Sequence, residues 1–194
     1  MLESGTAEIR LVVGLGNPGP EYDFTRHNIG FAVLDRLASD WKLGWERTKK
    51  WGAYSAKAEH AILLKPMTYM NRSGEPFAAV SQFYKVEPAE TLIVFDDMSL
   101  DLGRLRIRLD GSSGGHNGLE SILMHAGTDT IPRLRIGIGA APAGMATDYV
   151  LGRFFEDERS IVENAVVRAA DAVKCAIDKG VLSAMNTFNK FPES

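Results

Sequence analysis

Short apolar runs rich in β-branched residues alternate with amphipathic segments along the whole chain, and this alternation constrains the fold most. Residues 9–15 (IRLVVGL) and 91–97 (TLIVFDD) have the length and composition of buried strands. After the first of them, apolar residues recur at helical spacing, as at Ile29, Val33 and Leu37. Strands interleaved with helices predict an α/β fold: a twisted, mixed, mostly parallel β-sheet with helices on both faces. Functional residues are then expected in the loops at the carboxyl ends of the strands.

The rest of the chain fits the same pattern. A length of 194 residues, with no internal repeat or linker, predicts a single domain over residues 1–194. The other expected elements are two strands within residues 51–66, joined near Glu59 and His60; a helix at 75–86; strands at 104–111 and 132–139; a glycine loop that leads to a helix within 112–127; and a long amphipathic helix at 157–179.

Composition limits where the protein works and what it binds. The chain is 45% hydrophobic and 24% charged, as in ordinary globular proteins, and its single cysteine, Cys175, suits a reducing cytoplasm. The N-terminus lacks the apolar stretch of a signal peptide, and no run reaches the roughly 18 apolar residues of a membrane span. We therefore expect a cytoplasmic protein. The formal net charge of −3 argues against indiscriminate nucleic-acid binding but allows a local basic patch.

Residues 14–19 spell G-x-G-x-x-G, the signature of dinucleotide-binding folds. In those folds a helix begins inside the signature, so that its free N–H groups meet the phosphates. Here Pro18 and Pro20 enclose Gly19 and favour an irregular loop, with the helix delayed to about Thr25. The acidic residue that should close a second strand about 20 residues later is also missing. The sequence therefore argues against a dinucleotide cofactor.

This loop instead carries three side chains suited to chemistry. Asn17 follows a strand, Tyr22 lies in the loop and His27 falls in the first turn of the expected helix. The positive end of the helix dipole favours a neutral imidazole, which can accept a proton. The alternative is that His27 only helps to cap the helix.

Arginines alternate with apolar residues in the strand at 104–111. Arg104, Arg106 and Arg108 share one face, and Arg133 and Arg135 follow the same alternation on the next strand. They could form a positive surface for phosphates, although charged residues on the outer face of a strand are often simply solvated.

Six segments, in one order over nearly the whole chain, resemble the bacterial-type peptidyl-tRNA hydrolase family. They are GLGNPGPEYDFTRHNIGF (14–31), KPMTYMNRSG (65–74), IVFDDMSLDLGRLRIR (93–108), GGHNGLESI (114–122), RLRIGIG (133–139) and AMNTFN (184–189).

The resemblance implies hydrolysis of the ester between a peptide and the terminal ribose of tRNA, without cofactor or metal, by a monomer with no obligate protein partner. It implies His27 as general base and Asp96 as the partner that orients it. The same resemblance implies a binding site for the peptide and the tRNA 3′ end lined by Asn17, Tyr22, Met70, Asn71, His116 and Asn117. It also favours contacts between tRNA phosphates, such as those of the acceptor stem, and Arg106, Arg108, Arg133 and Arg135. Water can serve as the nucleophile, and asparagines can donate to an oxyanion.

One departure and two alternatives stay open. The family pattern after the catalytic aspartate is acidic-Leu/Met-Asp, whereas this chain has Asp97-Met98-Ser99, so packing or tRNA contacts at Ser99 could differ. His27, Asp96 and His116 could instead be metal ligands of a metallohydrolase, although their spacing fits no short metal motif. The third reading is a non-catalytic RNA-binding or RNA-processing factor.

Overall fold

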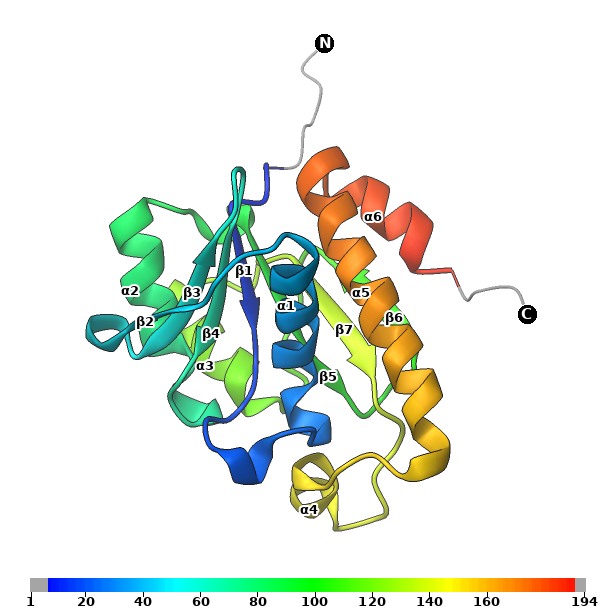
Figure 1. Ribbon diagram of the computed structural model, residues 1–194. Helices are drawn as coiled ribbons and strands as arrows, with labels where there is room; N and C mark the ends of the chain where they lie inside the picture. Colours follow the sequence, from blue (N-terminus) through cyan, green and yellow to red (C-terminus); the bar gives the residue numbers. More distant parts are fainter. Residues whose placement is uncertain (1–6, 191–194) are drawn as a thin grey trace.

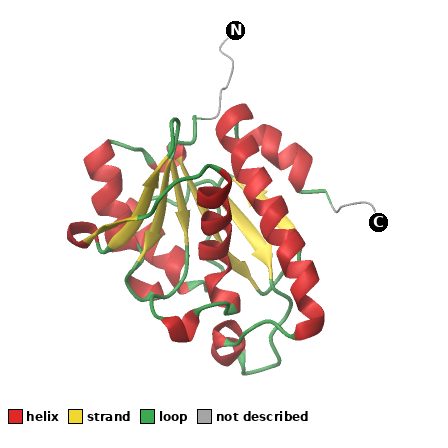
Figure 2. Cartoon of the chain, in the orientation of Figure 1, coloured by secondary structure: helices red, strands yellow, loops and turns green. Residues whose placement is uncertain are grey.

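The computed structural model describes residues 7–190, which form one seven-stranded sheet between layers of helices (Figures 1 and 2). The strand order is β2-β3-β4-β1-β5-β7-β6. The four strands β4, β1, β5 and β7 pair in parallel, whereas β2, β3 and β6 are antiparallel to their neighbours. The predicted mixed sheet is therefore confirmed. The strands are β1 Leu11–Gly14, β2 Glu46–Thr48, β3 Ala53–Lys57, β4 Ile62–Pro66, β5 Thr91–Asp97, β6 Leu105–Arg108 and β7 Arg133–Gly137.

Two hydrophobic clusters, one on each face of the sheet, hold the helices in place. Along β5, Leu92 and Val94 pack with residues of α1, α5 and α6, whereas Ile93 and Phe95 pack with residues of α2 and α3. The alternation of side chains along each strand is what divides the core into these two layers. The helices are α1 Ile29–Asp40, α2 Gly74–Tyr84, α3 Asn117–Ala126, α4 Ala146–Leu151, α5 Arg159–Lys179 and α6 Val181–Phe188.

The first turn of α1 packs directly on strand backbone. A Cβ added at Gly30 would lie 2.6 Å from the backbone N of Leu15 and would also collide with the carbonyl of Val94. At Gly14, an added Cβ would meet the carbonyl group of Gly30. Only glycine permits this approach, which places the residues just before α1 beside the carboxyl ends of β1 and β5.

The sequence did not predict three short elements. These are β2, α4 and α6, and α4 contains no fully buried residue, so it leaves no apolar stripe to detect. The predicted irregular loop at residues 14–25 is confirmed, with a single 3-10 turn at Pro20–Tyr22. The predicted start of α1 was slightly early, since His27 lies in a 3-10 turn, Arg26–Asn28, just ahead of the α-helix.

The ends of the chain lie outside this description. Residues 1–6 and 191–194 are not among the described residues, so a single domain over all of 1–194 stays a prediction. Within residues 7–190, no helix combines the length and the apolar character that crossing a membrane requires.

Candidate active site

Three neighbouring parallel strands bring their carboxyl ends to one edge of the sheet, and polar residues gather there. Asn17 follows β1, Asp96 is the penultimate residue of β5, and Met70 opens the 3-10 turn Met70–Arg72 beyond β4. The carboxyl edge of parallel strands is where α/β proteins commonly place their ligands. The close approach of Gly30 adds His27 to the same edge.

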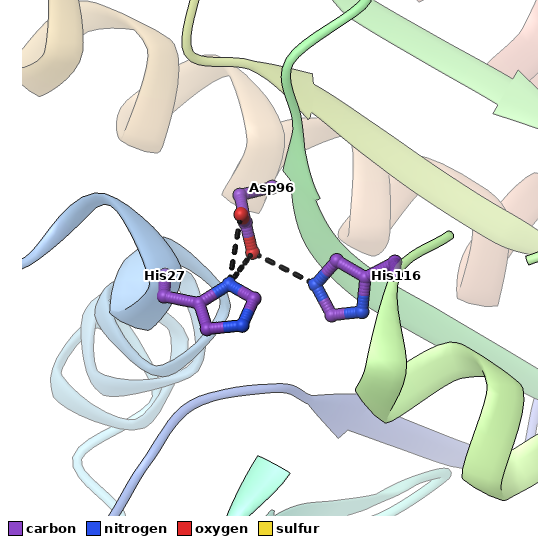
Figure 3. A group of neighbouring side chains, drawn as sticks. All are labelled: His27, Asp96 and His116. Atoms are coloured by element: carbon purple, nitrogen blue, oxygen red, sulfur yellow. Dashed lines mark hydrogen bonds and ion pairs between the residues drawn. The ribbon is translucent and has the colours of Figure 1, made fainter. Parts of the chain in front are cut away.

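Asp96 lies between two histidines (Figure 3). His27 Nδ1 is 2.9 Å from each carboxylate oxygen of Asp96, and His116 Nε2 is 2.9 Å from Oδ1. The two imidazole rings lie 4.9 Å apart between centroids. All three side chains are at most 10% exposed, so the cluster is shielded from bulk water.

The hydrogen bonds fix the proton positions on both rings. The backbone N–H of Leu119 donates to His116 Nδ1 at 3.2 Å, so the proton of a neutral His116 is on Nε2 and is donated to Asp96. A neutral His27 likewise donates from Nδ1 to Asp96, which leaves Nε2 with a free lone pair. His27 Nε2 has no hydrogen-bond partner within residues 7–190, and it is the nitrogen that could accept a proton.

Asp96 stays ionised despite its burial. Burial alone raises the pKa of this carboxyl, but the attraction and hydrogen bonds of His116, followed by those of His27, outweigh it and hold the pKa well below its usual range. An aspartate that remains an anion can keep orienting both histidines while a proton moves at His27 Nε2.

The lowered pKa of Asp96 predicts a pH-dependent part of the stability. A carboxyl whose pKa is lower in the folded state stabilises the protein above its unfolded pKa of about 4, and this contribution is lost as the pH falls through the folded value. The difference in free energy of unfolding between wild type and Asp96→Asn should therefore shrink below about pH 4. Urea unfolding at stepped pH measures it, and a constant difference across that range would contradict the lowered pKa.

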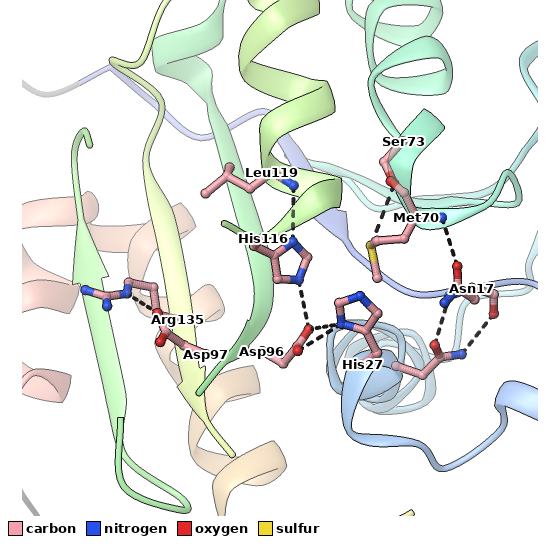
Figure 4. Close-up of polar contacts among 10 residues, drawn as sticks. Asn17, His27, Met70, Ser73, Asp96, Asp97, His116, Leu119 and Arg135 are labelled. Atoms are coloured by element: carbon pink, nitrogen blue, oxygen red, sulfur yellow. Dashed lines mark hydrogen bonds and ion pairs between the residues drawn. The ribbon is translucent and has the colours of Figure 1, made fainter. Parts of the chain in front are cut away.

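Asn17 is held by two neighbouring segments (Figure 4). Its Oδ1 accepts the N–H of Met70 at 2.8 Å, while the Asn28 side chain bonds both the backbone N–H and the carbonyl of Asn17. The Nδ2 group of Asn17 has no partner within residues 7–190 and remains available to a substrate oxygen. Asn28 was not predicted from the sequence. Its position just before a helical stripe signals an N-cap, but its side chain bonds Asn17 instead of the helix.

The structure brings together five of the predicted site residues and leaves three apart. Hydrogen bonds connect His27, Asp96 and His116, and a separate hydrogen bond connects Asn17 to Met70. No such contact connects the side chains of the other three to either group, and these stay predictions: Asn71 and Asn117, both exposed, and the half-buried Tyr22. His116 was predicted to bind substrate, but both of its ring nitrogens already bond within the protein, to Asp96 and to the N–H of Leu119. Its role in this structure is to hold Asp96.

The predicted phosphate-binding arginines fall into two groups. The register pairs Arg106 with Arg135 and Arg108 with Arg133, so all four share one face of β6 and β7, as predicted. The phosphate contact predicted for Arg133 is wrong for this structure, because that residue is 2% exposed. Its guanidinium donates to the backbone carbonyls of Ile131, Gly111, Ser112 and Asp129.

Arg135 connects this face of the sheet to Asp97, the neighbour of Asp96. Its Nε donates to Asp97 at 2.6 Å and its Nη2 to Ser99 Oγ at 3.1 Å. Ser99 in turn donates to Asp97 from both its N–H and its hydroxyl. Ser99, which stands where the family pattern has aspartate, therefore completes a small polar network. Burial raises the pKa of Asp97, but the hydrogen bonds from Ser99 and Arg135 outweigh it and lower that pKa.

A groove of about 880 Å³ lies against the same loop. Asn17 and Asn28 line it, together with Phe24, Lys65 and Arg153, but His27, Asp96 and His116 do not. The groove therefore borders the candidate site without containing its reacting groups, and we do not assign the reaction to it.

The three groups of the cluster could also be read as metal ligands. One donor atom each from His27, Asp96 and His116 lies within 4.8 Å of the others. However, the two histidine nitrogens nearest Asp96 are placed as N–H donors to its carboxylate, and these are the atoms that a metal would need deprotonated. The hydrogen-bond pattern favours the proton-transfer interpretation.

Fold and site together define an α/β protein whose buried aspartate orients a histidine, with an asparagine after the end of the neighbouring strand β1. A family model described as peptidyl-tRNA hydrolase matches residues 11–194. The curated peptidyl-tRNA hydrolase of Geobacillus kaustophilus is 46% identical over 186 residues, which cover 94% of this chain and 100% of the relative. That of Synechocystis is 46% identical over 185 residues, covering 93% and 95%. The chain belongs to the peptidyl-tRNA hydrolase family.

A solved structure agrees with this assignment. The crystal structure of the peptidyl-tRNA hydrolase from Acinetobacter baumannii superposes with a TM-score of 0.90 at 38% identity, covering 97% of this chain and 98% of that one. At that similarity the two chains have the same fold.

Proposed function

We propose that the protein hydrolyses the ester bond that joins a peptide to the terminal ribose of tRNA, and so recycles tRNA from abandoned translation. The observation that carries this proposal is the orientation of His27: Nδ1 is held by a buried, ionised Asp96 while Nε2 is free. The membership of the family supports the same substrate.

In this mechanism the nucleophile is water. His27 Nε2 accepts a proton from the water as its oxygen attacks the ester carbonyl, and Asp96 stabilises the imidazolium that forms. The Nδ2 group of Asn17 donates to the oxyanion of the tetrahedral intermediate. The intermediate collapses when the ribose oxygen leaves and takes the proton back from His27. His116 anchors Asp96 through Nε2.

Substrate contacts complete the proposal. Tyr22, Met70, Asn71 and Asn117 would receive the peptide and the tRNA 3′ end; Asn71 and Asn117 directly follow Met70 and His116 in the sequence. Arg106 and Arg108, which make no ion pair within residues 7–190, would contact acceptor-stem phosphates, with Arg135 in support. We further propose a cytoplasmic monomer that needs neither cofactor nor protein partner. Activity that survives exhaustive chelation would support the absence of a metal.

Substrates with a blocked amine should be strongly preferred. The proposed substrate-binding residues include the amides of Asn17, Asn71 and Asn117 and the thioether of Met70, and Asp96, the carboxylate of the cluster, already bonds two histidines. A free ammonium would therefore remain unpaired, so N-acetyl-aminoacyl-tRNA should be cleaved about 10²-fold faster than the same aminoacyl-tRNA. Release of the acyl amino acid with intact tRNA measures this. Equal rates would contradict the proposed lining, and no turnover of either substrate would favour the RNA-binding alternative.

The exposed arginines should matter for tRNA affinity. Arg108→Ala should reduce the salt dependence of tRNA binding, log Kd against log salt, by about one unit, as expected for one lost phosphate contact. Arg47→Ala is the matched control, because Arg47 is an exposed arginine on β2, the strand at the opposite edge of the sheet. If the slope of log Kd against log salt is the same in wild type and in Arg108→Ala, Arg108 is a solvated surface residue that does not contact tRNA.

A further inference from the structure

The residue before His27 is a buried cation that the mechanism above does not use. Arg26 is 2% exposed, and its guanidinium lies over three aromatic rings, 4.2 Å from the centroid of Tyr149, 5.2 Å from Phe154 and 5.0 Å from Phe155. Burying a guanidinium is costly unless it is paired, so this placement needs a compensating role.

The guanidinium connects the turn that carries His27 to the segment of residues 146–158. Its Nη2 donates to Glu158 Oε2 at 2.9 Å and its Nη1 to the carbonyl of Arg153 at 2.6 Å. Glu158 Oε2 also accepts the N–H of Phe155, so one carboxylate fixes both the cation and the local backbone. The N–H of Arg26 donates to the carbonyl of Gly152, which adds a backbone contact.

This segment is held by a few other contacts: the hydroxyl of Tyr149 donates to the carbonyl of Ile138 at 2.7 Å, Tyr149, Val150 and Phe154 pack against the core, and Arg153 forms an isolated β-bridge with Thr25. Helix α4, Ala146–Leu151, contains no fully buried residue. Gly152 leaves room for the guanidinium, since a Cβ there would lie 3.2 Å from Arg26 Nη1. Among these contacts, the side chain of Arg26 is the one that ties Glu158 and Arg153 directly to the turn that carries His27.

The turn that carries Arg26 and His27 is also short. Residues Arg26–Asn28 form a single 3-10 turn, which cannot hold its own geometry because so few hydrogen bonds close it. Its ends are fixed from outside: Asn28 is bonded to Asn17, and Arg26 to Glu158 and Arg153. His27 lies between these two attachments.

We propose that Arg26 is a positioning residue for His27: by fixing the catalytic turn to residues 146–158, it sets the direction of the imidazole toward Asp96. This inference rests on the proposed function for its kinetic readout only. A base displaced by about 1 Å can cost about 10²-fold in rate, so the cost should appear in kcat.

The test compares Arg26→Gln with Arg10→Gln. Arg10, just before β1, also combines a carboxylate partner with backbone carbonyls, although it is more exposed: its guanidinium bonds Glu90 and the carbonyls of Lys85 and Tyr84. With N-acetyl-aminoacyl-tRNA, Arg26→Gln should lower kcat about 10–100-fold with little change in KM, and Arg26→Lys should recover part of the loss. Arg10→Gln should keep wild-type kcat, even where both variants lose equal stability in urea unfolding.

A measurement without substrate separates this proposal from the proposed function. The NMR signal of the His27 Nδ1 proton, assigned by its absence in His27→Ala, should shift or broaden in Arg26→Gln and stay in place in Arg10→Gln. Unchanged signal and unchanged kcat in folded Arg26→Gln would overturn the positioning role, as would an equal loss of kcat in Arg10→Gln. Should Arg26→Gln not fold, Glu158→Gln removes the charge partner and must give the same changes in weaker form, or the proposal fails. If wild type cleaves no substrate, the proposed function fails while the NMR comparison still decides the role of Arg26.

Discussion

Replacing His27 by alanine should lower kcat by about 10²–10⁴, the range for loss of a general base. The side chain carries the one cluster nitrogen without a partner in residues 7–190, and no neighbouring group can substitute for it, because His116 uses both of its ring nitrogens. Single-turnover hydrolysis of N-acetyl-aminoacyl-tRNA measures the chemical step directly.

The control for this variant is His60→Ala. The side chain of His60 is 64% exposed and, within residues 7–190, pairs only with Glu59, so its loss should leave kcat near the wild-type value. If His27→Ala kept more than about a tenth of wild-type kcat, the assignment of His27 as the general base would be wrong.

Asp96→Asn should also lower kcat strongly while KM changes little. The asparagine keeps the shape of the side chain, but its NH2 group can turn toward His27 Nδ1 and favour the tautomer whose Nε2 is protonated and cannot act as a base. The variant also removes the negative charge that stabilises the imidazolium.

His27 and Asp96 act as one unit in this mechanism, so their losses should not add. The double variant should be within a few-fold of His27→Ala alone, as expected for members of one catalytic group. Steady-state kcat of wild type, the two single variants and the double variant together form a double-mutant cycle that measures this coupling. Fully multiplicative losses would mean that Asp96 acts on the reaction independently of His27.

Much of the fold could be predicted because the spacing of apolar residues within each segment differs between strands and helices. The buried strands at 91–97 and 132–139 and the long helix at 157–179 match β5, β7 and α5 closely. Such elements bury a continuous apolar face, and periodicity reports burial. Of the three elements that were missed, β2 and α4 have three and six residues, none of them fully buried, and α6 has eight residues, of which Val181 and Ala184 are buried.

The site was less predictable because its contacts join distant segments. Sequence pattern and resemblance suggested His27 with Asp96, but nothing local indicated that His116 bonds the same carboxylate from a loop 20 residues away. Alternation predicted the face of Arg133 correctly and its environment wrongly, because the loop carbonyls of Gly111 and Ser112 close over the guanidinium. The contact between Arg26 and Glu158 spans 132 residues and has no local signature.

The packing of Gly30 against Leu15 and Val94 has a consequence for how this protein can vary. The turn Arg26–Asn28 precedes a helix whose backbone contacts the strands with no side chain between them, so the position of the turn depends on the absence of side-chain atoms at Gly14 and Gly30. A methyl group at Gly14 or Gly30 would push α1 away from the strands and displace His27, although neither glycine has a role in the proposed reaction. Among relatives, amino-acid substitutions should therefore be most frequent on the outer surface of α1 and rarest at Gly14 and Gly30, where any side chain would collide with backbone.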